Sequence, residues 1–329
     1  PIDFTGTICP IVCVTWYLCH TQKNTNLSTM ATLYNKEDPD TLRRRLENSD
    51  EDRLTLSFYQ YHHIDDPDTF RDEIYRRFDA FDVLGRIYVA EEGINAQMSV
   101  PENQFEDFRK DLYSIPWLYG IRLNEAIEHA KDAFIKLTVK VRPKIVADGL
   151  NDDTFDVMEK GEHIDADEFN ELTESNETVV VDMRNHYESE VGHFRDAITP
   201  DVETFREALP EVIKVLSGNK DKPVIMYCTG GIRCEKASAY LKHNGFKKVY
   251  QLDGGIIEYA RQVRQKGLEN KYIGKNFVFD ERLGERISED VIAHCHQCGK
   301  PCDRHVNCNN DACHILFIQC EECAEKYNA

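Results

Sequence analysis

The alternation of apolar and polar residues predicts two regions with different architectures. Between residues 53 and 141, segments with a strand-like period of two alternate with segments of helical period. The predicted order is strand, helix, two strands, helix and strand, over residues 53–61, 68–81, 85–100, 101–115 and 134–141. In the last strand the expected inward positions are Ile135, Leu137, Val139 and Val141. This βαββαβ order is that of a ferredoxin-like α+β domain.

From about residue 163 the pattern becomes one of strands and helices in alternation. Continuous apolar runs there are typical of parallel strands that are covered on both faces. Strands are expected at 178–183, 222–228 and 247–252, and helices at 202–216 and 234–245. Cys228 then lies where a parallel strand ends and a helix is about to begin, the edge at which α/β sheets bind ligands.

Length and charge refine the domain picture. A chain of 329 residues that is 41% hydrophobic exceeds one core, so two or three domains are expected. The net charge is −19, but residues 151–177 alone hold eleven Asp or Glu and one Lys, a net −10, as in a solvated linker. The rest is mildly acidic, which excludes no nucleic acid, although no basic stripe indicates one. The sequence contains no run of about 18 apolar residues, so no membrane span is predicted.

The cysteines indicate metal and thiol chemistry in a reducing cytoplasm. Seven of the twelve lie between residues 295 and 323. Two CxxC motifs separated by 21 residues predict one zinc site, formed by Cys295, Cys298, Cys320 and Cys323. A second site is predicted from Cys302, Cys308 and Cys313, with His305 or His314. An iron–sulfur cluster is the chemical alternative. No role is assigned to Cys9, Cys13 and Cys19.

The segment MYCTGGIRCEKAS, residues 226–238, surrounds Cys228 with groups that stabilise an anion. Gly230 and Gly231 let successive N–H groups turn inward, and the following helix adds the positive end of its dipole. Arg233 adds a full positive charge, so an acidic, nucleophilic thiol is expected. Only four residues, Thr229 to Ile232, separate Cys228 from Arg233, one fewer than in cysteine phosphatases. The smaller loop favours a persulfide carrier over a phosphatase.

Five neighbouring side chains have open roles. Asp182 and Arg184 leave the end of the first strand and are expected to form an ion pair that braces the loop. Glu188 and His193 are candidates for lining the pocket, although a His after Gly192 more often stabilises a turn. Cys234 either resolves a Cys228 persulfide as a disulfide or packs at the start of the helix.

Longer motifs resemble a known family. Residues 163–267 resemble a rhodanese domain, with VVVDMRNHYESEVGHFRDAI, the loop YCTGGIRC and the closing LDGGIIEYA. FYQYHHIDDP, EEGINAQMSV, VKVRPKIVADG, IGKNFVFDERLGERI and the cysteine-rich end resemble the bacterial tRNA uridine-34 hydroxylase family, from Met30 almost to the end. The resemblance implies O2-dependent hydroxylation at C5 of the wobble uridine, with Cys228 as the catalytic, persulfide-type cysteine and the tRNA anticodon arm as partner.

These observations together define the expected organisation. We expect an unassigned extension at 1–29, a ferredoxin-like domain at 30–147, an acidic linker at 148–162, a rhodanese domain at 163–267 and a zinc-binding module at 268–329. Residues 1–29 are expected to lie upstream of the natural protein or to form a divergent extension.

Three functions compete: a tRNA hydroxylase, a persulfide sulfurtransferase acting on thiosulfate or tRNA, and a zinc-dependent RNA-binding adaptor. The intact Cys228 loop disfavours the adaptor, and the full-length resemblance favours the hydroxylase. The sequence names no electron donor and no oligomeric state.

Overall fold

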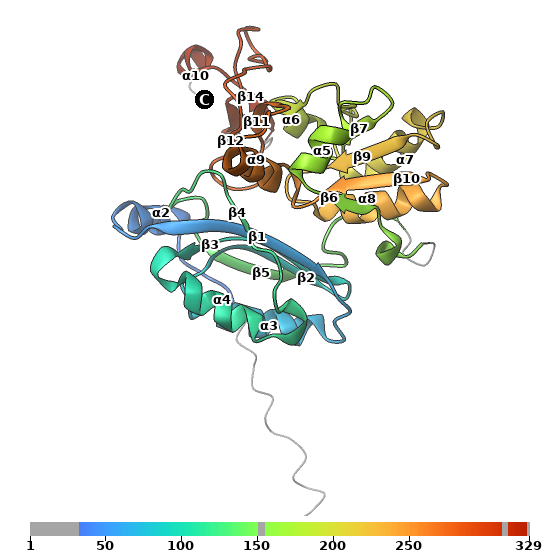
Figure 1. Cartoon of the computed structure of the whole chain (residues 1–329). Coiled ribbons are helices and arrows are strands. Elements are labelled where there is room, and N and C mark those ends of the chain that lie inside the picture. Colours follow the sequence, from blue (N-terminus) through green and yellow to red (C-terminus); the bar gives the residue numbers. More distant parts are fainter. Residues whose placement is uncertain (1–32, 151–154, 311–314, 328–329) are drawn as a thin grey trace, which may run out of the picture. The chain divides into compact units, whose positions relative to one another are not determined.

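The N-terminal domain is built on a mixed sheet whose strand order is β4-β1-β3-β2-β5, in which every pair except β2 and β5 is antiparallel. The structure is a computed structural model that describes residues 33–150, 155–310 and 315–327 (Figure 1). Residues 35–329 form one compact unit. The predicted extension at 1–29 lies outside the described residues. The strands are β1 (Arg53–Tyr61), β2 (Leu84–Ala90), β3 (Gly93–Pro101), β4 (Asn124–Glu125) and β5 (Leu137–Val141).

The order of the first four strands is that of a ferredoxin-like fold, but the fourth strand is not the predicted one. The two-residue β4 takes that place, antiparallel to β1. The predicted strand at 134–141 is β5, which pairs in parallel with β2 at the opposite edge. Leu137 and Val139 are buried as expected, whereas Val141 is 37% exposed because it ends an edge strand.

Helices cover only one face of this sheet. They are α3 (Pro67–Asp79) and α4 (Phe105–Tyr113), with 3-10 turns at Glu102–Gln104 and Pro116–Leu118, and α2 (Pro39–Glu47) precedes β1. Along β3 the residues Ile94, Ala96, Met98 and Val100 are completely buried, as the alternation predicts. The opposite side of each strand carries polar and aromatic residues, so the second face of the sheet is amphipathic rather than a core.

The second domain contains a parallel sheet with the order β6-β10-β9-β7. Its strands are β6 (Glu162–Ile164), β7 (Val179–Asp182), β9 (Pro223–Tyr227) and β10 (Lys248–Leu252). Its helices are α5 (Ala166–Leu172), α6 (His186–Ser189), α7 (Phe205–Val215), α8 (Ile232–His243) and α9 (Gly255–Lys266), with a 3-10 turn at Val157–Glu159. Two apolar clusters fill the two sides of the sheet, which explains why its strands are continuously apolar.

The acidic stretch that precedes this domain is only partly a solvated linker. Residues 151–154 lie outside the described part, but β6 and α5 are formed within the stretch. Asp165 caps α5 by accepting from the N–H groups of Asp167 and Glu168, so acidic residues stabilise the positive end of the helix. Asp148 is buried, and its carboxylate contacts Lys236 Nζ at 2.5 Å.

Lys236 ties the two domains together from inside the molecule. It belongs to α8, its side chain is fully buried, and its Nζ also lies 2.6 Å from the carboxylate of Glu92, just before β3. Removing one partner of such a buried ion pair is strongly destabilising, because it leaves the other charge buried and unpaired. The N-terminal and parallel-sheet domains therefore share a buried ionic cluster.

The C-terminal segment begins by extending the second domain. Strand β11 (Tyr272–Asn276) pairs with β8 (Gly192–Phe194) on one side and with β12 (Glu285–Arg286) on the other. The cysteine-rich end follows, with a hairpin of β13 (His305–Asn307) and β14 (Leu316–Ile318) and helix α10 (Glu321–Tyr327).

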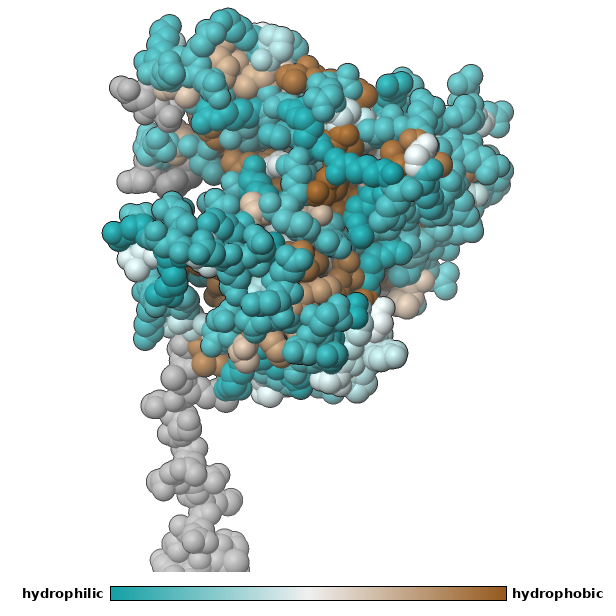
Figure 2. Space-filling model, turned by 60° about the vertical axis from the view of Figure 1, so that its left-hand side comes forward, coloured by the Kyte–Doolittle hydropathy of each residue, from teal (hydrophilic) through white to brown (hydrophobic). Residues whose placement is uncertain are grey.

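One face of the molecule is largely polar (Figure 2). Figure 2 shows a mostly hydrophilic face on which hydrophobic residues are confined to a few small patches. Within the described ranges no helix has both the length and the apolar character needed to cross a bilayer.

Candidate active site and metal centre

Cys228 lies between the end of β9 and the start of α8, as the apolar pattern predicts. The backbone N–H of Gly231 donates to Cys228 Sγ at 3.2 Å. Gly231 has φ +99°, a conformation that side chains other than glycine rarely adopt. A Cβ at this position would lie 2.8 Å from Tyr59 Oη, so both the conformation and the space require glycine.

The surroundings of Cys228 make its thiol acidic. Burial raises its pKa, but a hydrogen bond from Cys234, the charge of Arg233 and the backbone N–H groups of Arg233 and Gly231 outweigh burial and lower it to about 6. Burial and the neighbouring Cys228 raise the pKa of Cys234 well above its usual value. Cys234 therefore stays protonated and can donate to a Cys228 thiolate. This arrangement agrees with the packing role for Cys234 and does not test the resolving role.

Arg233 is held by a carboxylate that the sequence did not assign to it. Its Nη1 and Nη2 donate to Glu188 Oε1 and Oε2 at 2.6 and 2.8 Å, and Glu188 is fully buried in α6. Burial lowers the pKa of Arg233, but Glu188 raises it overall. Nη2 also lies 3.5 Å from Thr229 Oγ1. Glu188 thus positions Arg233 rather than facing the pocket as a free acid.

Asp182 and Arg184 form the expected structural ion pair. Both are fully buried, and Arg184 Nη2 donates to Asp182 Oδ2 and to the carbonyl of Gly192, each at 2.6 Å. Asp182 pairs with Tyr227, the residue before Cys228, across β7 and β9. His193 lies in β8, and its Nδ1 is 2.9 Å from the carbonyl of Phe194. His193 does not line the cavity next to Cys228.

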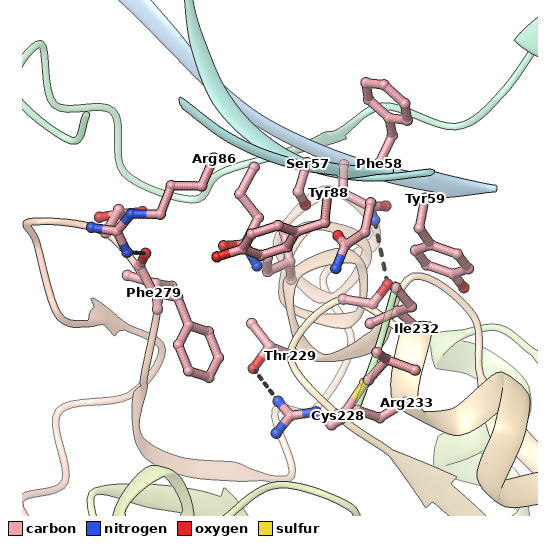
Figure 3. A pocket seen from close by; sticks show the side chains of 18 of the residues that line it. Ser57, Phe58, Tyr59, Arg86, Tyr88, Cys228, Thr229, Ile232, Arg233 and Phe279 are labelled. Atoms are coloured by element: carbon pink, nitrogen blue, oxygen red, sulfur yellow. Dashed lines mark hydrogen bonds between the residues drawn. The ribbon is translucent and has the colours of Figure 1, made fainter. Parts of the chain in front are cut away.

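That cavity has a volume of about 450 Å³ and separates the Cys228 loop from the polar face of the N-terminal sheet. The loop contributes Cys228, Thr229, Gly230, Ile232 and Arg233, and the segment after β11 contributes Val278, Phe279, Asp280 and Arg282. Figure 3 shows Ser57, Tyr59 and Tyr88 projecting from the sheet towards the loop, while Phe58 points to the other side. The volume is within the range of about 300–1,000 Å³ that small-molecule sites occupy.

The sequence interpretation missed this sheet face as part of the site. Ser57, Tyr59, Asn95 and Gln97 are the polar positions of amphipathic strands, which ordinarily face water. A signal was present, because Tyr59 and Tyr88 put large aromatic rings on the side that was expected to face solvent.

Four cysteines of the C-terminal end meet as predicted. One sulfur from each of Cys295, Cys298, Cys320 and Cys323 lies within 4.8 Å of the others, and Cys298 Sγ is 3.6 Å from Cys320 Sγ. Tetrahedral zinc with bonds of about 2.3 Å needs sulfur atoms about 3.8 Å apart, so this set fits a metal ion. The backbone N–H of Cys320 donates to Cys295 Sγ at 3.4 Å, which suits a thiolate ligand.

The second predicted metal site stays a prediction. Cys313 and His314 lie outside the described residues, and Cys302 and Cys308 belong to no group of metal-ligating side chains in the described part of the chain. His305 is buried, and its Nε2 lies 3.0 Å from the carbonyl of Tyr187. Burial lowers the pKa of His305 to about 4. His305 therefore joins the cysteine-rich end to α6.

Three family models match successive parts of the chain. A "UPF0176 acylphosphatase like domain" matches residues 53–145, a "Rhodanese-like domain" matches residues 165–262, and a "Rhodanase C-terminal" model matches residues 273–329. Among solved structures, a rhodanese-like domain protein from Staphylococcus aureus is 27% identical, with 30% of this chain and 90% of that chain covered and a TM-score of 0.25. The rhodanese-like domain of an Anabaena protein is 19% identical, with coverages of 34% and 78% and a TM-score of 0.27.

Curated relatives match nearly the whole chain. The tRNA uridine(34) hydroxylase of Escherichia coli K12 / DH10B is 54% identical over 299 residues, which are 91% of this chain and 85% of the relative. The protein of the same name from Escherichia fergusonii is 54% identical over 300 residues, or 91% and 86% of the two chains. With this identity over this length, the chain belongs to the tRNA uridine(34) hydroxylase family.

Proposed function

We propose that this protein hydroxylates C5 of uridine 34 in tRNA, with Cys228 as the catalytic nucleophile. The observation that carries the proposal is the position of an acidic thiol on a cavity large enough for a nucleotide base. The substrate follows from the membership of this chain in the tRNA uridine(34) hydroxylase family. The protein would act in the cytoplasm on the anticodon arm, and the wobble nucleotide would leave the anticodon stack to reach the thiol.

The chemistry of uracil explains why a thiolate is useful. C5 of uridine does not react readily with an oxidant, but addition of the Cys228 sulfur to C6 makes C5 a nucleophilic, enolate-type carbon. C5 then takes one oxygen atom of O2, and the other leaves as water with two electrons and two protons from a reductant. Loss of the C5 proton expels the sulfur, which restores the ring double bond and regenerates the thiolate.

The neighbouring residues have distinct proposed roles. Arg233, held by Glu188, and the N–H of Gly231 keep the sulfur anionic, while Thr229 to Ile232 form the wall of the loop. The ion pair of Asp182 and Arg184 stabilises the end of β9, and Cys234 donates a hydrogen bond to Cys228 Sγ. The Cys295 set would hold zinc, which supplies no reactive group and stabilises a segment that has few large apolar side chains.

Isotope labelling tests the oxidation directly. Purified protein, unmodified tRNA with uridine 34 and a reductant are incubated under 18O2, and the nucleosides are analysed by mass spectrometry. The proposal requires 5-hydroxyuridine with one 18O atom and no added sulfur. 5-Hydroxyuridine that is labelled only from water would refute the O2 step.

The nucleoside analysis and one further assay test the alternative function, a sulfurtransferase. A persulfide on Cys228 could instead transfer sulfur, since the loop accommodates one extra sulfur atom. A thiolated uridine, or thiocyanate formed from thiosulfate and cyanide at a rate that depends on Cys228, would identify a sulfurtransferase.

A further inference from the structure

The face of the N-terminal sheet opposite Cys228 carries an ordered grid of polar and aromatic side chains. Residues on one face of adjacent strands are neighbours when their backbones pair. Asn95 of β3 pairs with Tyr59 of β1 and with Tyr88 of β2. The next row joins four strands, since Ser57 pairs with Asn124 and Gln97, and Gln97 pairs with Arg86. All seven residues line the cavity, as do the loop residues Cys228 to Gly230.

The second row lies directly above the loop. A Cβ added to Gly230 would lie 3.8 Å from Asn124 Nδ2 and 3.9 Å from Ser57 Oγ. Asn124 Nδ2 is 3.5 Å from the carbonyl oxygen of Gly230, the second residue after Cys228. The row therefore meets the loop at Gly230 and lines the same cavity as Cys228.

Several polar groups of the grid have no protein partner. Asn124 is 4% exposed, and its Oδ1 is one of the buried atoms of the described chain without a hydrogen bond. The side chains of Ser57 and Gln97 likewise make no hydrogen bond with the described residues. A buried acceptor without a partner is destabilising, so such a group in a cavity wall points to a ligand that satisfies it.

The orientation of the Asn124 amide decides which ligand fits. The carbonyl of Gly230 can only accept, so it fixes the NH2 group of Asn124 towards itself and leaves Oδ1 as an acceptor. The N3–H of uracil satisfies this acceptor, whereas N3 of cytosine is itself an acceptor and would oppose it. The hydroxyl of Ser57 and the NH2 group of Gln97 are donors for the two carbonyl oxygens of uracil.

Tyr88 supplies the surface on which a base can lie. Its ring projects into the cavity, and Arg142 lies 5.4 Å from the ring centre, a cation–π contact that restrains the ring. Sheets that expose aromatic rings bind single-stranded RNA by stacking its bases on those rings. Tyr59 is less available, because its hydroxyl donates to Glu235 at 3.0 Å.

We propose that this sheet face is the uracil-reading surface of the enzyme. Tyr88 stacks on the flipped base, Asn124 accepts from N3–H, and Ser57 and Gln97 donate to the carbonyl oxygens, which turns C5 and C6 towards Cys228. This inference rests on the proposed function for its substrate. It assigns base selection to the N-terminal domain and the chemistry to the loop.

A protection assay tests the inference without requiring turnover. Alkylation of Cys228 by iodoacetamide is followed by peptide mass spectrometry, with and without an anticodon stem-loop that carries uridine or cytidine at position 34. We expect the uridine stem-loop to protect wild-type Cys228 at a concentration at least tenfold below that of the cytidine stem-loop. Tyr88→Ala and Gln97→Ala should weaken this protection about 5- to 100-fold, as expected for the loss of one stacking or base-edge contact.

Matched variants separate recognition from folding. Tyr88→Phe should recover most of the affinity that Tyr88→Ala loses, and Asn124→Leu should abolish the preference for uridine over cytidine. Gln104→Ala, an amide truncation outside the cavity, is the control for Gln97→Ala. Alkylation without RNA should proceed at the wild-type rate in Gln104→Ala, and for each other variant its own rate without RNA is the baseline from which protection is calculated.

The outcomes distinguish this inference from the proposed function. Equal protection by both stem-loops, or full protection of Tyr88→Ala and Gln97→Ala, would overturn the inference even if 5-hydroxyuridine is formed. Selective protection by the uridine stem-loop without any 5-hydroxyuridine would instead refute the hydroxylase function and leave uracil recognition standing.

Discussion

The acidity of Cys228 depends on a buried charge that can be removed without leaving another charge unpaired. In the double variant Arg233→Gln/Glu188→Gln, an amide pair replaces the bidentate ion pair whose contacts are 2.6 and 2.8 Å. Replacing both members avoids the large destabilisation that follows when one buried ion loses its partner. Comparison of the double variant with Glu188→Gln alone therefore isolates the effect of the Arg233 charge on the thiol.

The size of the effect follows from the pKa. With a pKa of about 6, about nine-tenths of Cys228 is thiolate at pH 7, compared with about 1% at the usual value of 9.0. A nearby opposite charge typically accounts for about 1–3 units, so its loss should raise the pKa to 7 or above. A pKa of about 7–9 leaves about one half to one hundredth of the thiol ionised at pH 7. The alkylation rate at pH 7 should then fall about 2- to 100-fold.

The pH dependence of Cys228 alkylation, measured by peptide mass spectrometry, checks this value. The wild-type rate should be half-maximal near pH 6 and should fall about tenfold per pH unit below that point. Glu188→Gln alone is the matched control, because it keeps the positive charge and should not move the midpoint upward. A double variant that is folded, by circular dichroism, and keeps its midpoint near pH 6 would refute the role given to Arg233.

Three further outcomes are expected. Cys228→Ala should abolish formation of 5-hydroxyuridine while the thermal unfolding midpoint changes little; full activity in this variant would remove Cys228 from the mechanism. Gly231→Ala should lower the free energy of unfolding by about 1–3 kcal/mol, because of its φ of +99° and the 2.8 Å approach to Tyr59, whereas Gly218→Ala, with nothing within 4 Å, should not. Elemental analysis should find at least one zinc per chain, whose removal by a thiol-reactive reagent speeds hydrogen exchange in residues 290–327; iron with labile sulfide would contradict zinc.

The sequence predicted those parts of the fold whose side chains follow a regular period. The continuous apolar strands located Cys228 at the end of β9, and the CxxC spacing located the four-cysteine set. β4 escaped prediction because two residues carry no period, so the longer β5 was given its place. A strand of any length can pair at either edge of a sheet, and only the structure shows which edge is free.

The contacts between distant segments were the part that the sequence did not predict. Nothing in the spacing indicates that Glu188 pairs with Arg233, 45 residues later. The polar face of β1 and β3 looks the same in a sequence whether water or a second domain lies above it. Such contacts depend on how the domains assemble, which local patterns do not encode.

The buried position of Lys236 bears on how this protein can have evolved. The rhodanese-like domain is matched by a family model of its own, over residues 165–262, as a module inherited alone would be. In this chain, however, one of the carboxylates that neutralise Lys236 comes from the N-terminal domain, and Asp148 lies before the first strand of the module. A gene fragment limited to the parallel-sheet module would encode a buried cation without these two counterions. Recombination at that boundary is therefore disfavoured unless Lys236 changes first, so the modules are expected to be inherited as a pair.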